Sequence, residues 1–130
     1  MEESSLRTPR LLFIEEDIFL ANIYAEHLRA AGWMVEIART GRDGLRLSAS
    51  RPDAILMDIL LPHGDGFSVL EQFKSDPITA EAPVFILTRL GQQRDIDRCR
   101  QLGAAGYMMK AHHLPEDVVR CLASVHSPQP

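Results

Sequence analysis

Five short apolar segments alternate with segments of helical periodicity along this chain, and this alternation constrains its fold more than any other feature. The apolar segments cover residues 11–14, 34–38, 54–57, 84–87 and 106–109. Short apolar runs without polar alternation are typical of strands that are covered on both faces. The pattern therefore predicts an α/β domain, doubly wound, with a five-stranded parallel sheet, right-handed connections and helices on both faces.

The segments between the predicted strands carry apolar residues at helical spacing. In the first of these segments such residues recur every three or four positions, at Leu20, Tyr24, Leu28 and Ala31, and Gly32 then supplies a helix stop. Four further helices are indicated by Leu45 and Leu47, by Phe67, Leu70 and Phe73, by Ile96, Cys99 and Leu102, and by Val118, Leu122 and Val125 after Pro115. We expect one helix after each strand.

Length and composition indicate a single soluble domain. A chain of 130 residues with 45% hydrophobic and 25% charged residues can bury a real core. A net charge of −4 argues against nucleic acid as a direct partner, and no apolar stretch is long enough to span a membrane. We predict a folded domain over residues 10–126, a disordered N-terminus over 1–9, and a tail or linker stub over 127–130.

The N-terminus and the cysteines favour the cytoplasm. The first five residues are acidic and polar, unlike a secretory signal. The two cysteines, Cys99 and Cys121, both fall in predicted helices and are interpreted as reduced thiols.

Carboxylates, a hydroxyl and an ammonium follow four of the predicted strands. Glu15 and Glu16 come after the first strand, Asp58 after the third, and Thr88 and Lys110 after the fourth and fifth. Because the carboxyl ends of parallel strands form the ligand-binding edge of an open α/β sheet, we expect these side chains on one rim. Carboxylates, a hydroxyl and an ammonium around one spot suit a divalent cation and a phosphoryl group.

Asp58 is the candidate nucleophile of this rim. A carboxylate can attack phosphorus to form an aspartyl phosphate. Turn-forming residues follow it at once, with Pro62 and the pair Asp65-Gly66. The alternative is that Asp58 only caps the strand end or forms an ion pair.

These residues, in this order, resemble the receiver domain of two-component response regulators, the CheY-like family. The resemblance runs from about residue 10 to about residue 126. It rests on the acidic pair, on Asp58 with its Pro-x-x-Asp-Gly sequence, and on Thr88, Tyr107 and Lys110. It implies the strand order 2-1-3-4-5. It also implies that a sensor histidine kinase or a phosphotransfer protein donates a phosphoryl group to Asp58 with the assistance of Mg²⁺ (or Mn²⁺).

The resemblance further implies a metal site. Glu16 and Asp58 would reach the ion directly or through water, Glu15 would be a second anchor, and the backbone carbonyl of Leu60 would complete the protein ligands. The neighbouring Asp17 is expected to begin the first helix instead, where a negative charge suits the helix dipole.

The remaining implied roles concern the response to phosphorylation. Thr88 and Lys110 would bind the phosphoryl oxygens, and Tyr107 would be the aromatic ring that moves inward. The alternative for Tyr107 is a half-buried residue at the sheet edge that packs against the fifth helix. The fourth helix, fifth strand and fifth helix would form the face for an unknown output protein or fused domain. The domain would be a monomer or weak homodimer with at most slow autophosphatase activity.

Three residues depart from the usual family pattern. Glu16 replaces an aspartate, Arg89 replaces a small residue after Thr88, and Ala111 replaces the proline after Lys110, so that we expect a trans peptide bond there. Arg89 could narrow the site or reach toward the phosphate. These departures leave open a pseudo-receiver, an interaction module that is not phosphorylated. An aspartate-nucleophile phosphatase is disfavoured, because Leu60 occupies the position of its second aspartate.

Overall fold

A five-stranded parallel sheet forms the centre of the molecule. The computed structural model describes residues 7–63 and 65–125. The strands lie in the order β2-β1-β3-β4-β5, which confirms the predicted doubly wound sheet. Their bounds are β1 Arg10–Ile14, β2 Met34–Ala38, β3 Ala54–Met57, β4 Val84–Thr88 and β5 Gly106–Met109.

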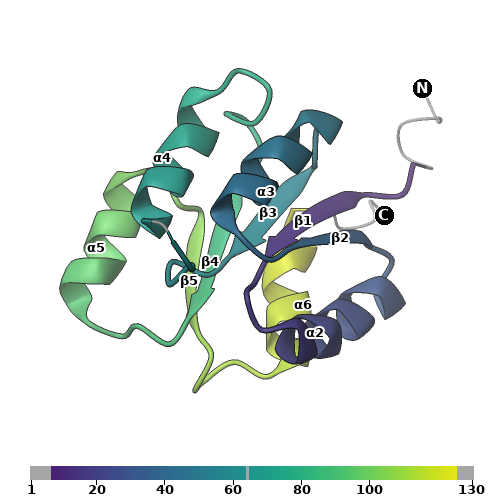
Figure 1. Cartoon of the computed structure of the whole chain (residues 1–130). Helices are drawn as coiled ribbons and strands as arrows, with labels where there is room; N and C mark the ends of the chain where they lie inside the picture. The colour runs from purple at the N-terminus through teal and green to yellow at the C-terminus, as the bar shows by residue number, and fades with distance from the viewer. Residues whose placement is uncertain (1–6, 64, 126–130) are drawn as a thin grey trace.

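Helices cover both faces of this sheet (Figure 1). On one face lie α2 (Ile18–Ala30) and α6 (Pro115–Ala123), and on the other lie α3 (Gly41–Leu47), α4 (Gly66–Ser75) and α5 (Gln93–Gln101), with a short 3₁₀ helix, η1 (Ser48–Ser50), after α3. Side chains cap several helix starts: Asp17 accepts from the backbone N–H of Leu20, and Asp65 accepts from that of Phe67. The prediction that Asp17 begins the first helix is therefore confirmed.

The central strands β1, β3 and β4 bury both of their faces, as predicted, whereas the edge strand β2 leaves Met34 and Glu36 exposed. In β1, Leu11 and Phe13 pack into the core beneath α2 and α6, whereas Leu12 and Ile14 pack into the core beneath α4 and α5. Every residue of β3 is buried. The register aligns Ile14 with Met57, so the residues that follow, Glu15 and Asp58, leave the sheet side by side.

The chain before β1 is fixed by a contact between distant segments. Arg7 forms an ion pair with Asp53, and the same carboxylate accepts a hydrogen bond of 2.7 Å from the backbone N–H of Arg10. Pro9 is buried. Of the N-terminus predicted to be disordered, residues 1–6 lie outside the described residues, and so does the predicted tail over 127–130.

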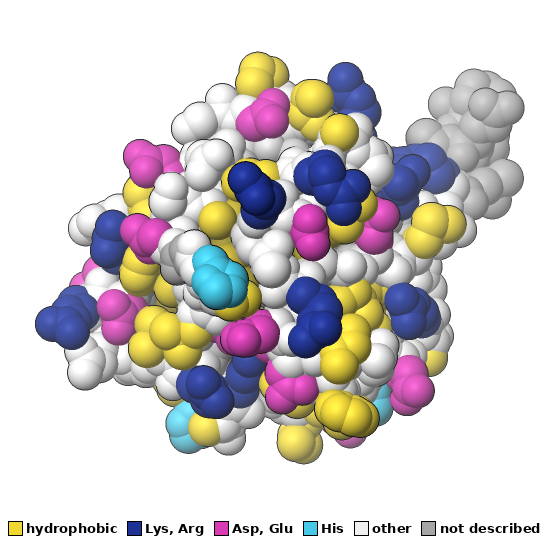
Figure 2. Space-filling view, viewed as in Figure 1, with side chains coloured by type: hydrophobic (Ala, Val, Ile, Leu, Met, Phe, Trp, Pro, Cys, Tyr) yellow, Lys and Arg dark blue, Asp and Glu magenta, His cyan; other side chains and the backbone are white. Residues whose placement is uncertain are grey.

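The surface carries charges of both signs. On the face drawn in Figure 2, Lys and Arg side chains are interspersed with Asp and Glu, and hydrophobic groups are scattered between them. Cys99 and Cys121 are both free thiols. None of the helices over residues 7–63 and 65–125 is long and apolar enough to cross a membrane.

Candidate functional site

A cleft of about 490 Å³ opens at the carboxyl ends of the strands. Six of the side chains predicted from the sequence line it: Glu15, Glu16, Asp58, Leu60, Arg89 and Lys110. They come from the segments that follow β1, β3, β4 and β5, as expected for the ligand-binding edge of an open α/β sheet. Thr88 and Tyr107 do not line the cleft.

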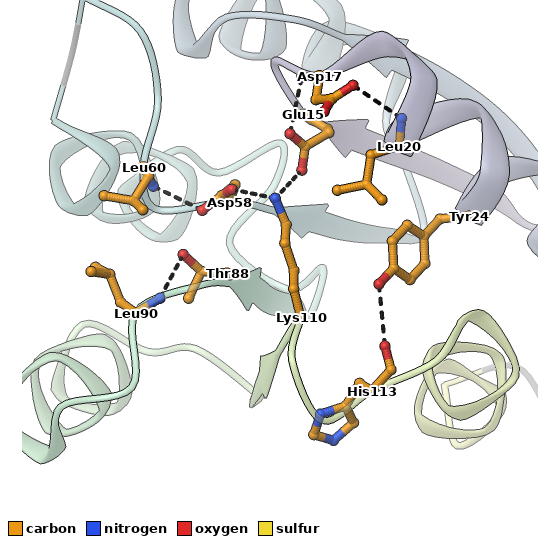
Figure 3. Close-up of polar contacts among 10 residues, drawn as sticks. All are labelled: Glu15, Asp17, Leu20, Tyr24, Asp58, Leu60, Thr88, Leu90, Lys110 and His113. Atoms are coloured by element: carbon orange, nitrogen blue, oxygen red, sulfur yellow. Dashed lines mark hydrogen bonds and ion pairs between the residues drawn. The ribbon is translucent and has the colours of Figure 1, made fainter.

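The ammonium of Lys110 lies at the centre of this cleft, between two carboxylates (Figure 3). Its Nζ is 2.7 Å from Asp58 Oδ2 and 2.7 Å from Glu15 Oε1. The contact with Asp58 has hydrogen-bond geometry, whereas the contact with Glu15 Oε1 is an ion pair by distance only. Both carboxylates are buried, with 4% of Asp58 and 3% of Glu15 exposed, so their charges depend on this shared cation.

The surroundings of Lys110 keep it charged. Burial on its own would lower the pKa of the ammonium. The close contacts with Asp58 and Glu15 and their negative charges act in the opposite direction and outweigh burial, so the pKa of Lys110 is raised above its ordinary value.

The backbone orients both carboxylates. Asp58 Oδ1 accepts a hydrogen bond of 2.9 Å from the N–H of Leu60, and Glu15 Oε2 accepts one of 3.0 Å from the N–H of Asp17. In each case a carboxylate binds the amide two residues later, a local turn that fixes the side chain. One oxygen of each group is thus held by the chain, and the other faces Lys110.

The oxygen atoms of the cleft fit a hard cation. Glu15 Oε1 is buried and accepts no hydrogen bond, and Asp58 and Leu60 lie in the same cleft. Among the described residues no group of three or more His, Cys, Asp or Glu side chains is arranged as a metal cage. Mg²⁺ does not need such a cage, since it is usually bound by one or two carboxylates and keeps several waters.

Glu16 differs from its neighbour Glu15. It is exposed, and its backbone carbonyl accepts a hydrogen bond of 3.2 Å from Arg39 Nε. Arg39 also lines the cleft and was not among the predicted site residues. Arg39 directly follows β2, and this position at the carboxyl end of a predicted strand is the sequence signal that indicates it.

Thr88 and Tyr107 both contact the connection between β4 and α5. Thr88 is fully buried, and its Oγ1 accepts a long hydrogen bond of 3.5 Å from the N–H of Leu90. The hydroxyl of Tyr107 donates to the carbonyl of Leu90 at 2.8 Å. Burial, with smaller effects from neighbouring charges, raises the pKa of the Tyr107 phenol to about 12.

The ring of Tyr107 packs on the face of the sheet that carries α5. It joins the core that contains Cys99 of α5, and it does not pack against α6. Of the alternative prediction for Tyr107, the half-buried position at the sheet edge is confirmed, whereas packing against the fifth helix is wrong. Side chains alternate along a strand, and because Met108 enters the core beneath α6, its neighbour Tyr107 faces the opposite side.

Arg89 and Ala111 are the two remaining residues that depart from the usual family pattern. Arg89 is exposed and lines the mouth of the cleft. No cis peptide bond occurs among the described residues, so the Lys110–Ala111 bond is trans, as predicted.

This arrangement defines a doubly wound α/β domain with a charged cleft at the carboxyl edge of its sheet, and comparison with known proteins identifies the family. The sequence model described as the response regulator receiver domain matches residues 11–120. The chain belongs to this family of two-component signalling proteins, whose members are signalling domains that work with histidine kinases or phosphotransfer proteins.

Similar curated proteins are longer than this chain. The transcriptional regulator RpaA of Synechocystis is 37% identical over 120 residues, which are 92% of this chain and 48% of that protein. The transcriptional activator PfeR of Pseudomonas aeruginosa is 33% identical over 113 residues, 86% of this chain and 36% of that protein. The chain thus spans half or less of the length of these two relatives.

Solved structures of similar fold include one with a metal. The receiver domain of the sensor histidine kinase PA1611 from Pseudomonas aeruginosa, with a magnesium ion coordinated in its active-site cleft, has a TM-score of 0.82 and 27% identity over 93% of this chain and 100% of that one. The phosphorylated cyanobacterial phytochrome response regulator RcpA has a TM-score of 0.84 and 26% identity over 95% and 98%.

Proposed function

We propose that Asp58 accepts a phosphoryl group from the phosphohistidine of a sensor histidine kinase or phosphotransfer protein. One observation carries this proposal: Asp58 is a buried carboxylate at the end of a central strand, oriented by the Leu60 amide and paired at 2.7 Å with Lys110. In the transfer a carboxylate oxygen of Asp58 attacks phosphorus, the phosphorus–nitrogen bond of the donor breaks, and the donor imidazole keeps the electron pair.

The residues of the cleft stabilise the charge that moves. Lys110 already lies beside the oxygen that accepts the phosphoryl group, so its ammonium can follow the phosphoryl oxygens without a large movement. Glu15, Glu16, Asp58 and the carbonyl of Leu60 would hold Mg²⁺ or Mn²⁺. When bound, the ion supplies positive charge against the carboxylates and the incoming phosphoryl oxygens.

The signal leaves through the connection between β4 and α5. Thr88 closes on the phosphoryl group, and the connection moves with it because Leu90 is bonded to both Thr88 and Tyr107. The face formed by α5, β5 and α6 then changes for an output protein or fused domain. Arg89 lies at the cleft mouth and slows loss of the phosphoryl group, which leaves only slow autophosphatase activity.

Exposed apolar side chains at the cleft rim support docking of the donor protein. Phe19 is 82% exposed and lines the cleft, Ile23 lies one helical turn later, and Leu114 directly precedes α6. Such side chains on a domain of net charge −4 suit a protein partner better than nucleic acid. The domain acts as a monomer or weak homodimer in the cytoplasm, where Cys99 and Cys121 stay reduced.

The second candidate is a pseudo-receiver that binds partners without phosphorylation. The exposed position of Glu16 and the presence of Arg89 in the cleft favour it. Incubation with phosphoramidate, with and without Mg²⁺, separates the two by intact-mass analysis. A receiver gains one phosphoryl group in the presence of Mg²⁺ and loses this ability in Asp58→Asn. A wild-type chain that gains no mass supports the pseudo-receiver.

A further inference from the structure

The connection from β5 to α6 covers residues 110–114 and carries Lys110 at its start. Ala111 occupies the position after Lys110, so no proline ring restrains the backbone there. Several hydrogen bonds of this connection join residues that are close together in the sequence. The N–H of His112 and the ring of His113 both bind the carbonyl of Met109, and the N–H of Leu114 binds Asp117.

A tyrosine from the opposite end of the sequence ties this connection to the rest of the domain. The hydroxyl of Tyr24, on α2, donates to the carbonyl of His113 at 3.2 Å (Figure 3). The two residues are 89 positions apart in the chain, so this bond is a tertiary contact and not part of a local turn. It joins α2 to the segment that begins with Lys110.

The ring of Tyr24 is itself held firmly. Only 5% of the residue is exposed, and its ring meets that of Phe13 edge to face, with centroids 6.3 Å apart and planes at 86°. Phe13 lies in β1, two residues before Glu15. Tyr24 therefore connects the strand that carries Glu15 with the connection that carries Lys110. The charges of Lys110 and Glu15 also act on the phenol, whose pKa burial raises.

We propose that Tyr24 is a positioning residue for Lys110. Through the carbonyl of His113, its hydroxyl holds the β5–α6 connection so that the ammonium of Lys110 stays between Asp58 and Glu15. For phosphoryl transfer this inference rests on the proposed function of Asp58. The restraint on Lys110 itself exists whether or not the domain is phosphorylated.

Tyr24→Phe tests the inference, since it keeps the buried ring and removes the hydroxyl alone. Loss of one neutral hydrogen bond that orients a reacting group should slow phosphorylation by phosphoramidate about two- to tenfold at saturating donor. The half-saturating concentrations of donor and of Mg²⁺ should change by less than about twofold, since no group that binds them is removed.

Thr79→Val is the matched control. The hydroxyl of Thr79 is also buried and donates to a backbone carbonyl, that of Phe73 at 2.7 Å, but it lies between α4 and β4, away from the cleft. This variant should lose stability and keep the wild-type phosphorylation rate. If it slows as much as Tyr24→Phe, general destabilisation explains both and the inference is overturned.

A spectroscopic measurement separates this inference from the proposed function. The chain has two lysines, Lys74 and Lys110, so ¹³C labelling at lysine Cε gives two resonances. In Tyr24→Phe the Lys110 resonance should move toward that of an exposed lysine, while that of Lys74, bound to the carbonyl of Ala82, stays in place. A wild-type chain that takes no phosphoryl group refutes the proposed function but leaves this test intact. An unchanged Lys110 resonance, or a raised half-saturating donor concentration at an unchanged maximal rate, overturns the positioning role.

Discussion

Two connections at the carboxyl edge of the sheet are each bound by a tyrosine hydroxyl, but the two tyrosines are enclosed differently. Tyr107 holds the β4–α5 connection through Leu90, and Tyr24 holds the β5–α6 connection through His113. Tyr107 is half-buried on β5, which is an edge strand, whereas Tyr24 is buried against Phe13. The proposed roles differ accordingly: the β4–α5 connection is proposed to move on phosphorylation, and the β5–α6 connection is proposed to stay in place.

The difference follows from what each connection carries. The β5–α6 connection positions an ammonium that is shared by two buried carboxylates, and any displacement leaves those charges unpaired. The β4–α5 connection carries Arg89 at the cleft mouth, where the side chain is exposed and water can replace its contacts. We therefore expect removal of the Lys110 ammonium to lower stability strongly and removal of the Arg89 side chain to leave stability nearly unchanged.

The largest effect is expected from removal of the shared cation. Lys110→Met should lower the free energy of unfolding by about 3 kcal/mol, because Asp58 and Glu15 remain buried without a partner. Arg89→Met is the control and should stay within about 0.5 kcal/mol of wild type, as is usual for an exposed residue. Urea unfolding at pH 7 without Mg²⁺ measures both. Equal losses in the two variants would remove the distinction between the two connections.

Mg²⁺ should stabilise the folded chain, because the carboxylates of the cleft lie close together in the folded state and not in the unfolded state. At a concentration ten times its dissociation constant the ion should add about 1.4 kcal/mol to the free energy of unfolding. Thermal melting shows this as an upward shift, which Glu16→Ala should largely abolish. The absence of a shift in wild type would support the pseudo-receiver.

On the β4–α5 side, Arg89 should lengthen the lifetime of phospho-Asp58. Its bulk obstructs the attacking water, and a charge-assisted hydrogen bond to the phosphoryl group would protect it further. Arg89→Ala should therefore hydrolyse about three- to tenfold faster than wild type once the donor is removed. Decay at the wild-type rate would mean that Arg89 points to solvent and belongs to the partner-binding surface.

The smallest effect concerns the phenol of Tyr107 at alkaline pH. Its pKa of about 12 in the folded chain lies above the ordinary value of 10.0, so folding favours the neutral form. The resulting stability is complete below pH 10 and is lost as the pH rises toward 12. Tyr107→Phe should flatten the loss of stability in this window. Ultraviolet titration of the two tyrosines checks the assignment, and a Tyr107 phenol that ionises near pH 10 would contradict it.

The sequence predicted the strands closely because buried parallel strands require short apolar runs. The two differences come from contacts between distant residues. β1 begins one residue early, at Arg10, whose N–H binds Asp53. β4 extends to Thr88, whose carbonyl accepts from the N–H of Lys110. No periodicity within a strand contains such information.

The residues of the site were predicted only in part, because some of their contacts also join segments that are distant in the sequence. The convergence of Asp58, Glu15 and Lys110 follows from strand order and register alone. Which glutamate turns inward does not, because that depends on the amide of Asp17 after the strand has ended. Tyr24 has the spacing of a core residue on α2, and nothing in that spacing indicates a partner near the other end of the chain.

Chemical trapping of the phosphorylated residue tests the central claim most directly. Borohydride reduces an acyl phosphate to the alcohol, so an aspartyl phosphate becomes homoserine, which peptide mass spectrometry can locate. After treatment with phosphoramidate and Mg²⁺, homoserine should occur at position 58, because the Asp58 carboxylate is both oriented by the Leu60 amide and paired with Lys110 through a hydrogen bond. Reduction at Glu15, Glu16 or any other carboxylate, or at none, would contradict the account.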